Sequence, residues 1–273
     1  MEYASTMRWT LDSIDFANIK VDRIRPNDDL MCLLCASAFI ESGSDIYTHN
    51  LVEHYRGDAE IEAWLRDHWE HEELQHGRAL ATYVTHVWPD FDFDAAFKSF
   101  IGEYAGVCKP ELLEPSRCLE MAARCVVETG TATLYRAIHE STDEPVLKAL
   151  TKNIKSDEVH HYSHFYHYFQ KYQSQQKLGR IKVLRTLWRR LREIGNEDGD
   201  IALRHVFKFR HPEYLVDQAT FRKASQRVYA VVRHNLSAEM AIKMMLKPLD
   251  LPARVNTAVQ PPLNWAARRF AIN

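Results

Sequence analysis

Glycine and proline are both scarce in this 273-residue chain, with 9 and 10 occurrences. So few turn formers disfavour a turn-rich all-β fold and favour long helices. The longest apolar run, residues 31–40, is about half of the roughly 20 residues that a transmembrane helix needs. The five cysteines follow no framework spacing and the N-terminal sequence is acidic and polar, so the chain does not resemble a secreted protein. We therefore expect a cytoplasmic helical protein.

Charge is unevenly distributed along the chain. Residues 1–170 carry 15 Lys and Arg against 29 Asp and Glu, whereas residues 171–273 carry 20 against 8. Packing of the acidic part on the basic part is the simpler interpretation, and a basic face for an acidic partner or a lipid surface is the alternative. The sequence contains no glycine-rich phosphate loop and no basic patch interleaved with aromatic residues, so we expect no nucleic-acid partner.

The pattern of apolar residues and helix breakers predicts four long helices. An irregular segment (1–26) precedes them, and a crossover with a short helix separates the second from the third. A basic C-terminal extension follows, with three or four shorter helices and an irregular tail after Pro252. We expect a four-helix region at 27–173 and a helical extension at 174–273, packed on the bundle. The long helices are predicted at about 28–55, 59–87, 111–140 and 145–173.

Carboxylates and histidines recur at helical spacing in two of these helices. Glu73 and His76 form one Glu-x-x-His step, and Glu158 and His161 form another. Residues three apart share one face of a helix, so each step directs a carboxylate and an imidazole to one point. The long helix before each step contributes a glutamate from an apolar or small-residue setting; these two residues are Glu41 and Glu128.

The spacing of these residues places them at matching heights. Glu41 and Glu73 are equidistant from Gly57, where we predict a turn, and the midpoint of Glu128 and Glu158 is residue 143, inside the next break. In an antiparallel helix pair such residues lie opposite one another, here roughly 22–24 Å from the loop. Two packed hairpins would then bring four carboxylates and two imidazoles to one level of a helical core.

Four converging buried carboxylates would repel one another, and each would cost several kcal/mol to bury alone. Two divalent cations remove both problems, and the mixed oxygen and nitrogen donors suit iron or manganese. We therefore predict a site for two Fe ions, with an Mn/Fe pair as the alternative. Its predicted ligands are Glu41, Glu73, His76, Glu128, Glu158 and His161.

This ligand pattern resembles the ferritin-like di-iron carboxylate superfamily, in which two helices each supply a Glu and two others a Glu-x-x-His step. The resemblance covers about residues 27–172. Locally, HEELQHGRALATY and SDEVHHYSHFYHYF are most similar to the ligand helices of soluble acyl-carrier-protein desaturases. The chain is shorter than those enzymes, its first hairpin is tighter and its basic C-terminal part does not align with them. The resemblance implies a ferritin-like four-helix bundle with a long crossover between helices two and three, plus extra C-terminal helices.

Further residues are candidates for supporting roles. Thr131 lies three residues after Glu128, where those desaturases carry a threonine beside the oxygen site; the alternative is a hydroxyl that bonds back to a helix carbonyl. Asp157 and Glu72 precede the two ligand glutamates. A metal-bound imidazole usually donates its other N–H to a carboxylate. We therefore predict crosswise bonds from His76 to Asp157 and from His161 to Glu72, with exposed helical acids as the alternative.

Other motifs favour ordinary structural roles. The stretch 181–194 is basic and amphipathic; packing on the bundle is favoured, with a membrane surface or an acidic carrier protein as the alternatives. Tyr47 and Tyr135 are weak candidates for redox roles. The Cys32-x-x-Cys35 spacing recurs in redox and zinc sites, but inside an apolar helix it favours buried core cysteines. A histidine stripe, for which an extra metal patch is the less favoured interpretation, comprises His160, His164 and His167.

Together these observations predict a di-iron oxidase or oxygenase that uses dioxygen on a hydrophobic, acyl-like substrate, by desaturation or hydroxylation. An electron donor such as a ferredoxin or reductase is implied, because the chain carries no flavin or iron–sulfur motif. An acyl carrier protein or a lipid-like molecule is the expected source of substrate, and the superfamily resemblance implies a homodimer. The alternatives are an iron- or peroxide-handling protein without organic substrate and a structural protein with a vestigial bundle.

Overall fold

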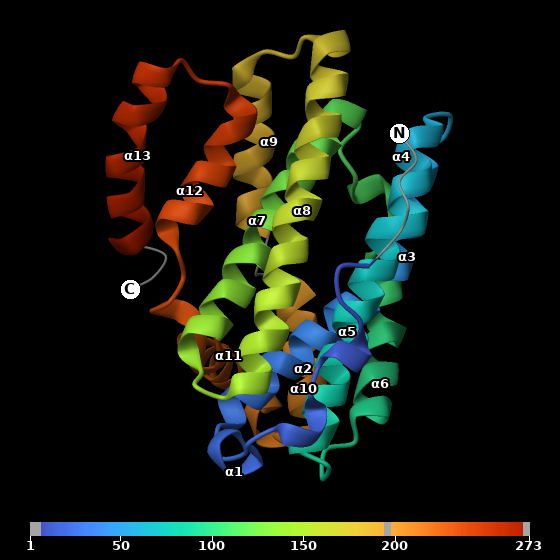
Figure 1. Cartoon of the computed structure of the whole chain (residues 1–273), viewed down its shortest axis with the longest axis vertical. Helices are drawn as coiled ribbons and strands as arrows, with labels where there is room; N and C mark the ends of the chain where they lie inside the picture. Colours follow the sequence, from blue (N-terminus) through green and yellow to red (C-terminus); the bar gives the residue numbers. More distant parts are fainter. Residues whose placement is uncertain (1–6, 194–197, 270–273) are drawn as a thin grey trace. The chain divides into compact units, whose positions relative to one another are not determined.

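Every regular element in the described part of the chain is helical (Figure 1). The computed structural model describes residues 7–193 and 198–269, and no strand occurs among them. The expected all-α class is therefore confirmed, whereas the ferritin-like bundle topology stays a prediction. The chain divides into two compact units. Unit 1 comprises Met1–Leu112, Asp143–Leu150 and Gly195–Val231, and unit 2 comprises Leu113–Thr142, Thr151–Ile194 and Val232–Asn273. The expected boundaries after residues 26 and 173 stay a prediction.

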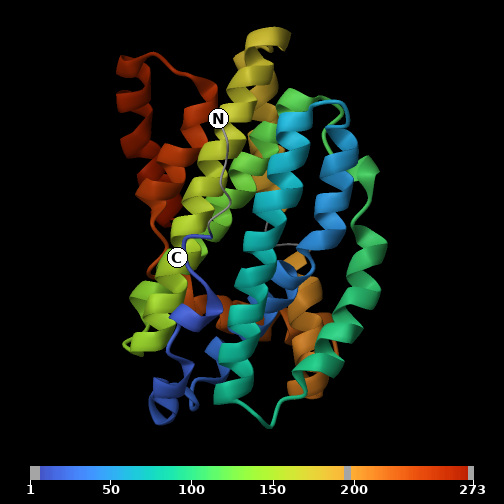
Figure 2. The same ribbon diagram turned by 45° about the vertical axis from the view of Figure 1, so that its right-hand side comes forward.

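Unit 1 is built around α2, which packs along α5 and α10 and also contacts α6. In Figure 2, α5 lies beside α2 and α3. The two 3-10 turns η1 (Leu11–Ser13) and η2 (Phe16–Asn18) and the one-turn helix α1 (Val21–Ile24) precede α2. The main helices of unit 1 are α2 (Asp28–Ser42), α3 (Ser44–His54), α4 (Ala59–Trp64), α5 (Glu70–Val87), α6 (Phe93–Val107), α10 (Asp198–Arg210) and most of α11 (Gln218–Arg233).

In unit 2, α7 contacts both α9 and α12, and α12 pairs with α13. Four hydrogen bonds join α7, or the Ser116 cap before it, to α8, which begins in unit 1 and continues through unit 2. The helices of this unit are α7 (Arg117–Ser141), α8 (Pro145–Gln176), α9 (Arg180–Glu193), α12 (Ala238–Leu246) and α13 (Ala253–Ala267).

The first predicted long helix is interrupted. Asn27 caps it, because its side chain accepts a hydrogen bond from the amide of Leu30. The helix predicted over about 28–55 does not continue unbroken, because α2 ends at Ser42 and Gly43 separates it from α3. A Cβ on Gly43 would lie 3.3 Å from the ring of Tyr104, so the break coincides with a close approach of α6. The expected turn after α3 is confirmed, and Gly57 there has a φ of +93°.

The second predicted long helix also departs from regular α geometry. A π-helical segment, η3 (Leu65–Trp69), lies between α4 and α5. Such segments are rare and occur frequently near functional sites. This one ends four residues before Glu73 and precedes the run of acidic and histidine residues at the start of α5. The apolar periodicity of the sequence does not distinguish a π turn from an α turn.

The segment Asp28–His54 is long and apolar enough to cross a membrane by length and composition alone, contrary to the expectation from continuous apolar runs. Most of its apolar window is buried within the protein. Leu30, Met31, Leu34 and Phe39 are all at most 2% exposed. Together with the packing of α2 on α5 and α10, this burial identifies the segment as a core helix pair of unit 1.

Three other expectations on secondary structure need correction. The crossover helix α6 has 15 residues rather than being short. The third long helix begins at Arg117, after the 3-10 turn η4 (Pro110–Leu112). The tail after Pro252 is not irregular, because α13 continues through Pro261 and Pro262. The short helices α9 to α12 match the three or four helices predicted for the basic extension.

Residues 7–26, expected to be irregular, contain η1, η2 and α1, and specific bonds hold the segment to the helices. The buried carboxylate of Glu144 accepts hydrogen bonds from the amides of Lys20 and Leu147 and from the hydroxyl of Tyr83. One side chain thus fastens the N-terminal segment, α5 and the start of α8 together. Burial and this carboxylate both raise the pKa of Tyr83, so its hydroxyl keeps the proton that it donates.

Helices α2 and α5 approach one another most closely at Gly77. A Cβ on Gly77 would lie 2.7 Å from the amide nitrogen of Ser42 and 2.9 Å from its Cα. Backbone atoms at these distances cannot rotate away as a side chain can. Glycine at this position therefore sets the distance between the two helices. Gly77 directly follows His76 in α5, and its contact residue Ser42 directly follows Glu41 in α2.

The substitution Gly77→Ala should separate α2 from α5 and destabilise the protein by about 1–3 kcal/mol, the usual cost of overpacking a core. Urea unfolding followed by circular dichroism measures this change. Gly102→Ala is the matched control, because Gly102 lies inside α6 with open space where a Cβ would point. The control should be neutral or more stable by up to about 1 kcal/mol, from helix propensity alone. Equal effects of the two substitutions would contradict the close approach.

Candidate metal centre

Unit 1 brings three of the predicted ligands together. Glu41 lies in the last turn of α2, and Glu73 and His76 lie on one face of α5. One ligand atom from each lies within 4.8 Å of the others. His76 Nδ1 is 3.6 Å from Glu41 Oε2. All three side chains are buried, with exposed fractions of 5%, 7% and 0%. We call this group the first half-site.

The N-terminal segment covers the first half-site. The ring of Trp9 is stacked parallel to the imidazole of His76, with the ring centroids 6.1 Å apart. The carbonyl of Trp9 accepts a hydrogen bond of 3.1 Å from the side chain of Gln75, the neighbour of His76. Both Trp9 and Gln75 are buried. An indole ring held in this way limits the rotation of His76 and excludes water from one side of it.

Unit 2 contains a second half-site of the same composition. Glu128 of α7 and Glu158 and His161 of α8 each have an exposed fraction of 1%. One ligand atom from each lies within 4.8 Å of the others. His161 Nδ1 is 3.6 Å from Glu128 Oε2 and 3.9 Å from Glu158 Oε2. The imidazole therefore faces both carboxylates.

Hydrogen bonds between α7 and α8 fix the height of the second half-site. Ser116 bonds to Gln176, Cys118 to Gln173 and Thr131 to Glu158. In sequence, the midpoint between the two residues of each pair falls at residues 144–146, where α8 begins. In unit 1, the contact of Ser42 with Gly77 has its midpoint near residue 60. Both hairpins thus pair their helices antiparallel, close to the predicted registers.

The donor atoms of each half-site fit a metal ion. The separations of 3.6–3.9 Å are too long for hydrogen bonds. If two ligand atoms each lie about 2.1 Å from the same ion, a ligand–ion–ligand angle of roughly 120–135° gives the same separations. Carboxylate and imidazole donors suit first-row transition metals such as iron and manganese. The protein therefore contains buried Glu and His clusters that resemble a di-iron site and can hold metal ions.

Thr131 contacts one of these carboxylates directly. Its hydroxyl lies 2.5 Å from Glu158 Oε2, and also 3.2 Å from the carbonyl of Glu128. A hydroxyl has one proton to donate, and the carboxylate is the nearer and more strongly accepting partner. The contact with the Glu128 carbonyl matches the alternative drawn from the sequence, a hydroxyl that bonds back to a helix carbonyl. Contact with a bound oxygen species stays a prediction.

The remaining predicted residues differ in their surroundings. Asp157 is 1% exposed and Glu72 is half-buried. Their crosswise bonds to the imidazoles would join residues of different units, and they stay a prediction. Tyr135 is fully buried and Tyr47 half-buried, which adds no support for redox roles. Among the described residues, the groups of ligand atoms close enough to hold an ion do not contain His160, His164 or His167.

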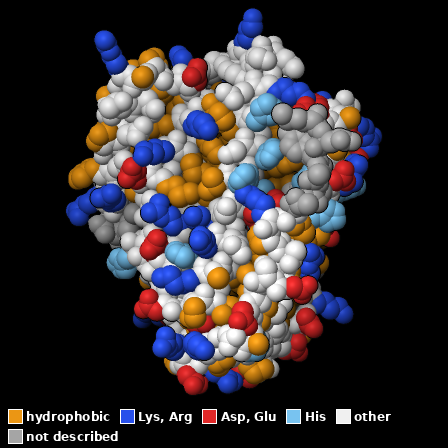
Figure 3. Space-filling model, in the orientation of Figure 1, with side chains coloured by type: hydrophobic (Ala, Val, Ile, Leu, Met, Phe, Trp, Pro, Cys, Tyr) orange, Lys and Arg blue, Asp and Glu red, His pale blue; other side chains and the backbone are white. Residues whose placement is uncertain are grey.

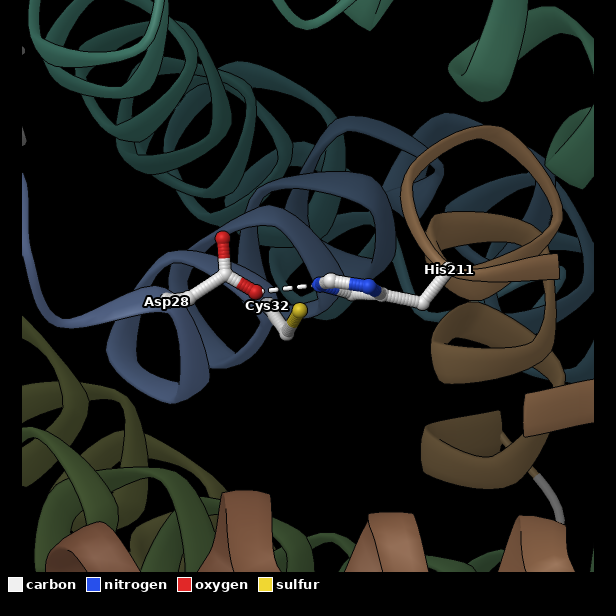
Figure 4. A group of neighbouring side chains, drawn as sticks. All are labelled: Asp28, Cys32 and His211. Atoms are coloured by element: carbon white, nitrogen blue, oxygen red, sulfur yellow. Dashed lines mark hydrogen bonds and ion pairs between the residues drawn. The ribbon is translucent and has the colours of Figure 1, made fainter. Parts of the chain in front are cut away.

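A second group of side chains in unit 1 has metal-binding residue types but is occupied by ion pairs. Asp28, Cys32 and His211 have ligand atoms within 4.8 Å of one another, and Figure 4 shows His211 directed at Asp28. Asp28 also accepts two hydrogen bonds from Arg210, at 2.9 and 3.0 Å. Burial raises the pKa of Asp28, but the bonds from His211 and Arg210 outweigh this and lower it.

The thiol of Cys32 has its pKa raised by burial, and the carboxylates of Asp28 and Asp29 add to this rise. A protonated thiol and an adjacent guanidinium both disfavour a divalent cation. We therefore interpret this group as an ion-pair cluster that fastens the end of α10 to the start of α2. Cys32 and Cys35 are buried and free, so the expectation of core cysteines is confirmed.

Sequence reasoning missed several residues that shape the half-sites. Gly77 sets the contact between α2 and α5, Trp9 covers His76, and Glu144 holds the N-terminal segment. Gly77 directly follows a ligand histidine in a helix, and a helical glycine is a signal of close packing. Trp9 contacts a residue 67 positions away in the sequence, and Glu144 contacts one 124 positions away. No local sequence pattern reveals such contacts.

Comparisons with known proteins add no assignment. No protein-family model matches the chain, and no curated protein matches its sequence. The interpretation of the site therefore depends on its residues and their geometry.

Removing the Thr131 hydroxyl should leave Glu158 without one of its donors. We expect Thr131→Val to lower the unfolding free energy of the metal-free protein by roughly 1–2 kcal/mol, and Thr131→Ser to restore most of it. Thr82→Val is the control, because the Thr82 hydroxyl bonds only to a carbonyl of its own exposed helix turn. It should change the stability by no more than about 0.5 kcal/mol. Denaturant titrations of the three variants measure these differences, and equal losses for Thr131→Val and Thr82→Val would contradict the role of the hydroxyl.

Proposed function

We propose that the two half-sites join into one dinuclear iron centre, and that the protein is a di-iron oxidase or oxygenase. The observation that carries this proposal is the matching composition of the half-sites: each consists of two buried glutamates and one buried histidine. Three protein ligands of this kind leave an ion short of its preferred coordination. Together the six residues would hold two ions. The ligands are the six predicted residues, and an Mn/Fe pair is the alternative metal content.

Electrostatics supports the same proposal. Four glutamates buried to this degree carry a formal charge of −4, and each unpaired buried carboxylate costs several kcal/mol. Two divalent ions balance this charge.

The protein residues have distinct roles in this proposal. Trp9 and the apolar helix faces exclude water, His76 and His161 are held in fixed orientation, and Thr131 holds a proton at Glu158 Oε2. Asp157 and Glu72 would accept the second N–H of the two imidazoles. Iron bound at the centre would supply the electrons that reduce dioxygen and the oxidising power that attacks a C–H bond.

The substrate is proposed from the local likeness of α5 and α8 to soluble acyl-carrier-protein desaturases. A hydrophobic, acyl-like chain, free, lipid-linked or carried by an acyl carrier protein, fits this likeness, and desaturation and hydroxylation are the two reactions to be separated. The electrons would come from a separate ferredoxin or reductase. A homodimer is proposed from the superfamily resemblance, and a cytoplasmic location from the cysteine pattern.

Anaerobic loading with Fe(II), followed by metal analysis and Mössbauer spectroscopy, tests the centre. We expect about two iron ions per chain with magnetic coupling between them, and rapid oxidation when dioxygen is added. Fatty-acyl compounds should then accelerate dioxygen consumption in the presence of a reductant. Fast iron oxidation that no acyl compound changes would instead indicate iron or peroxide handling, and fewer than two ions per chain would contradict the dinuclear centre.

Substitution within one half-site shows whether the two act together. In one dinuclear centre, His76→Ala should weaken binding of both ions, by about 10-fold or more, because the ions share ligands. His86→Ala, at an exposed position on the same helix, is the control and should bind iron as the parent does. Loss of a single ion from His76→Ala, with unchanged affinity for the other, would show two independent sites.

A further inference from the structure

Helix α9 buries only one of its two apolar faces. Val183, Thr186 and Leu187 are buried and face α7. The buried side of the amphipathic stretch thus packs on α7. A second row of large apolar side chains is solvent-exposed, with exposed fractions of 68% for Ile181, 51% for Leu184, 61% for Trp188 and 45% for Leu191.

These four residues form one continuous stripe. Their spacing of three, four and three residues confines them to a sector of roughly 80° along the full length of the helix. We call them the α9 stripe. By contrast, exposed apolar residues of α13 do not align, because Leu263 and Trp265 lie roughly 160° apart on that helix. On the face drawn in Figure 3, hydrophobic side chains over α12 and α13 are mixed with Lys and Arg.

Positive charge borders the α9 stripe. The helix carries six Lys and Arg residues against one Glu. Arg189 pairs with Glu114 and Glu193, and Arg190, on the side opposite the stripe, pairs with Glu120 and Glu193. The other cations flank the stripe: Arg192 and Arg185, with Lys182 beyond them, on one side and Arg180 on the other.

Arg180 has a positioning role at this surface. Its guanidinium donates hydrogen bonds to the carbonyls of Leu249 and Asp250, at 2.9 and 2.7 Å. These bonds fasten the start of α9 to the connection between α12 and α13. The helix is therefore held on two sides, by α7 along its buried face and by this connection at its first turn.

We propose that the α9 stripe docks the protein on an anionic lipid bilayer, with α9 lying parallel to the membrane surface. A helix with Trp and Leu on one side and Lys and Arg beside them matches the composition of interfacial helices. Basic residues close to an anionic leaflet are attracted to it, and their alkyl stems can bury while the charges stay in the headgroup region. This inference does not depend on the proposed metal centre.

Two other occupants fit the surface less well. In a symmetric contact between two copies, the same patch faces itself, so the cations bordering each stripe would face like charges. An acidic protein would satisfy the charges, but a projecting helix ridge needs a complementary groove in a protein partner. A fluid bilayer receives a convex apolar ridge without one. The test below distinguishes all three.

Sedimentation of the full-length protein with lipid vesicles tests the proposal. Vesicles of phosphatidylcholine with about 30 mol % phosphatidylserine should bind the protein, and vesicles of phosphatidylcholine alone should bind it at least about 10-fold more weakly. Binding should fall as salt is raised from about 0.05 to 0.5 M, because salt screens exposed charges. Trp188 fluorescence should shift to shorter wavelength on binding, and this shift should be absent from Trp188→Gln.

Two pairs of substitutions separate the apolar and charged contributions. Leu184→Gln/Trp188→Gln and Lys182→Glu/Arg185→Glu should each reduce binding to the anionic vesicles by about 10-fold or more. The matched controls are Val216→Gln, at a 72% exposed apolar position outside α9, and Lys152→Glu/Lys223→Glu, at exposed basic positions. Both controls should bind as the parent does, and all variants should keep the parent's thermal midpoint.

Three results would overturn the proposal. The first is vesicle binding that neither α9 variant changes relative to its control, or no binding at all. The second is a dimer in the absence of lipid that Leu184→Gln/Trp188→Gln dissociates, which would assign the stripe to a second copy. The third is α9-dependent binding to polyglutamate without binding to anionic vesicles, which would assign it to an acidic protein. Iron content is measured on the same samples. It shows whether the protein binds metal, independently of whether it binds vesicles.

Discussion

The burial of four glutamates and two histidines is the constraint on which the other features depend. Carboxylates remain away from water only when a cation, a hydrogen-bond donor or a metal ion compensates them. Elsewhere in the chain the compensation is visible. Glu144 accepts three hydrogen bonds, and Glu120 lies beside Arg124 and Arg190. Even so, burial raises the pKa of Glu120, and the two arginines offset this only in part. In each half-site a histidine lies close to both carboxylates.

The surrounding structure serves to hold these groups in place. Gly77 allows α5 to approach the backbone of α2, which brings His76 to Glu41. Trp9 stacks on the same imidazole and is itself bonded to Gln75. In the other unit, Thr131 donates to Glu158 from the neighbouring helix. Each half-site thus combines ligand-type residues on two antiparallel helices with at least one further contact that fixes their orientation.

Local periodicity was sufficient to predict the all-α class, the long helices and the members of each half-site. Spacing of three residues and equal distance from a turn are properties that a sequence displays directly. Departures from regular helices were not predictable in this way. Gly43 ends α2 where Tyr104 approaches, and α13 continues through two prolines in a tail that we predicted to be irregular. The contacts of Trp9 and Glu144 link distant segments, and the exposed α9 stripe has the same composition as a buried helix face. Tertiary packing decides such features.

The most direct test of the central claim compares the unfolding free energy of the parent with that of Glu128→Gln, with and without Fe(II), at about pH 8, where imidazoles of ordinary pKa are neutral. Glu140→Gln, at an exposed position of the same helix, is the control. If metal compensates the buried carboxylates, metal-free Glu128→Gln should be at least as stable as the metal-free parent. Fe(II) should then stabilise the parent by at least about 1.4 kcal/mol more than it stabilises the variant, which corresponds to a 10-fold difference in binding. A metal-free variant that is less stable than the parent, with equal stabilisation of both by Fe(II), would contradict the account.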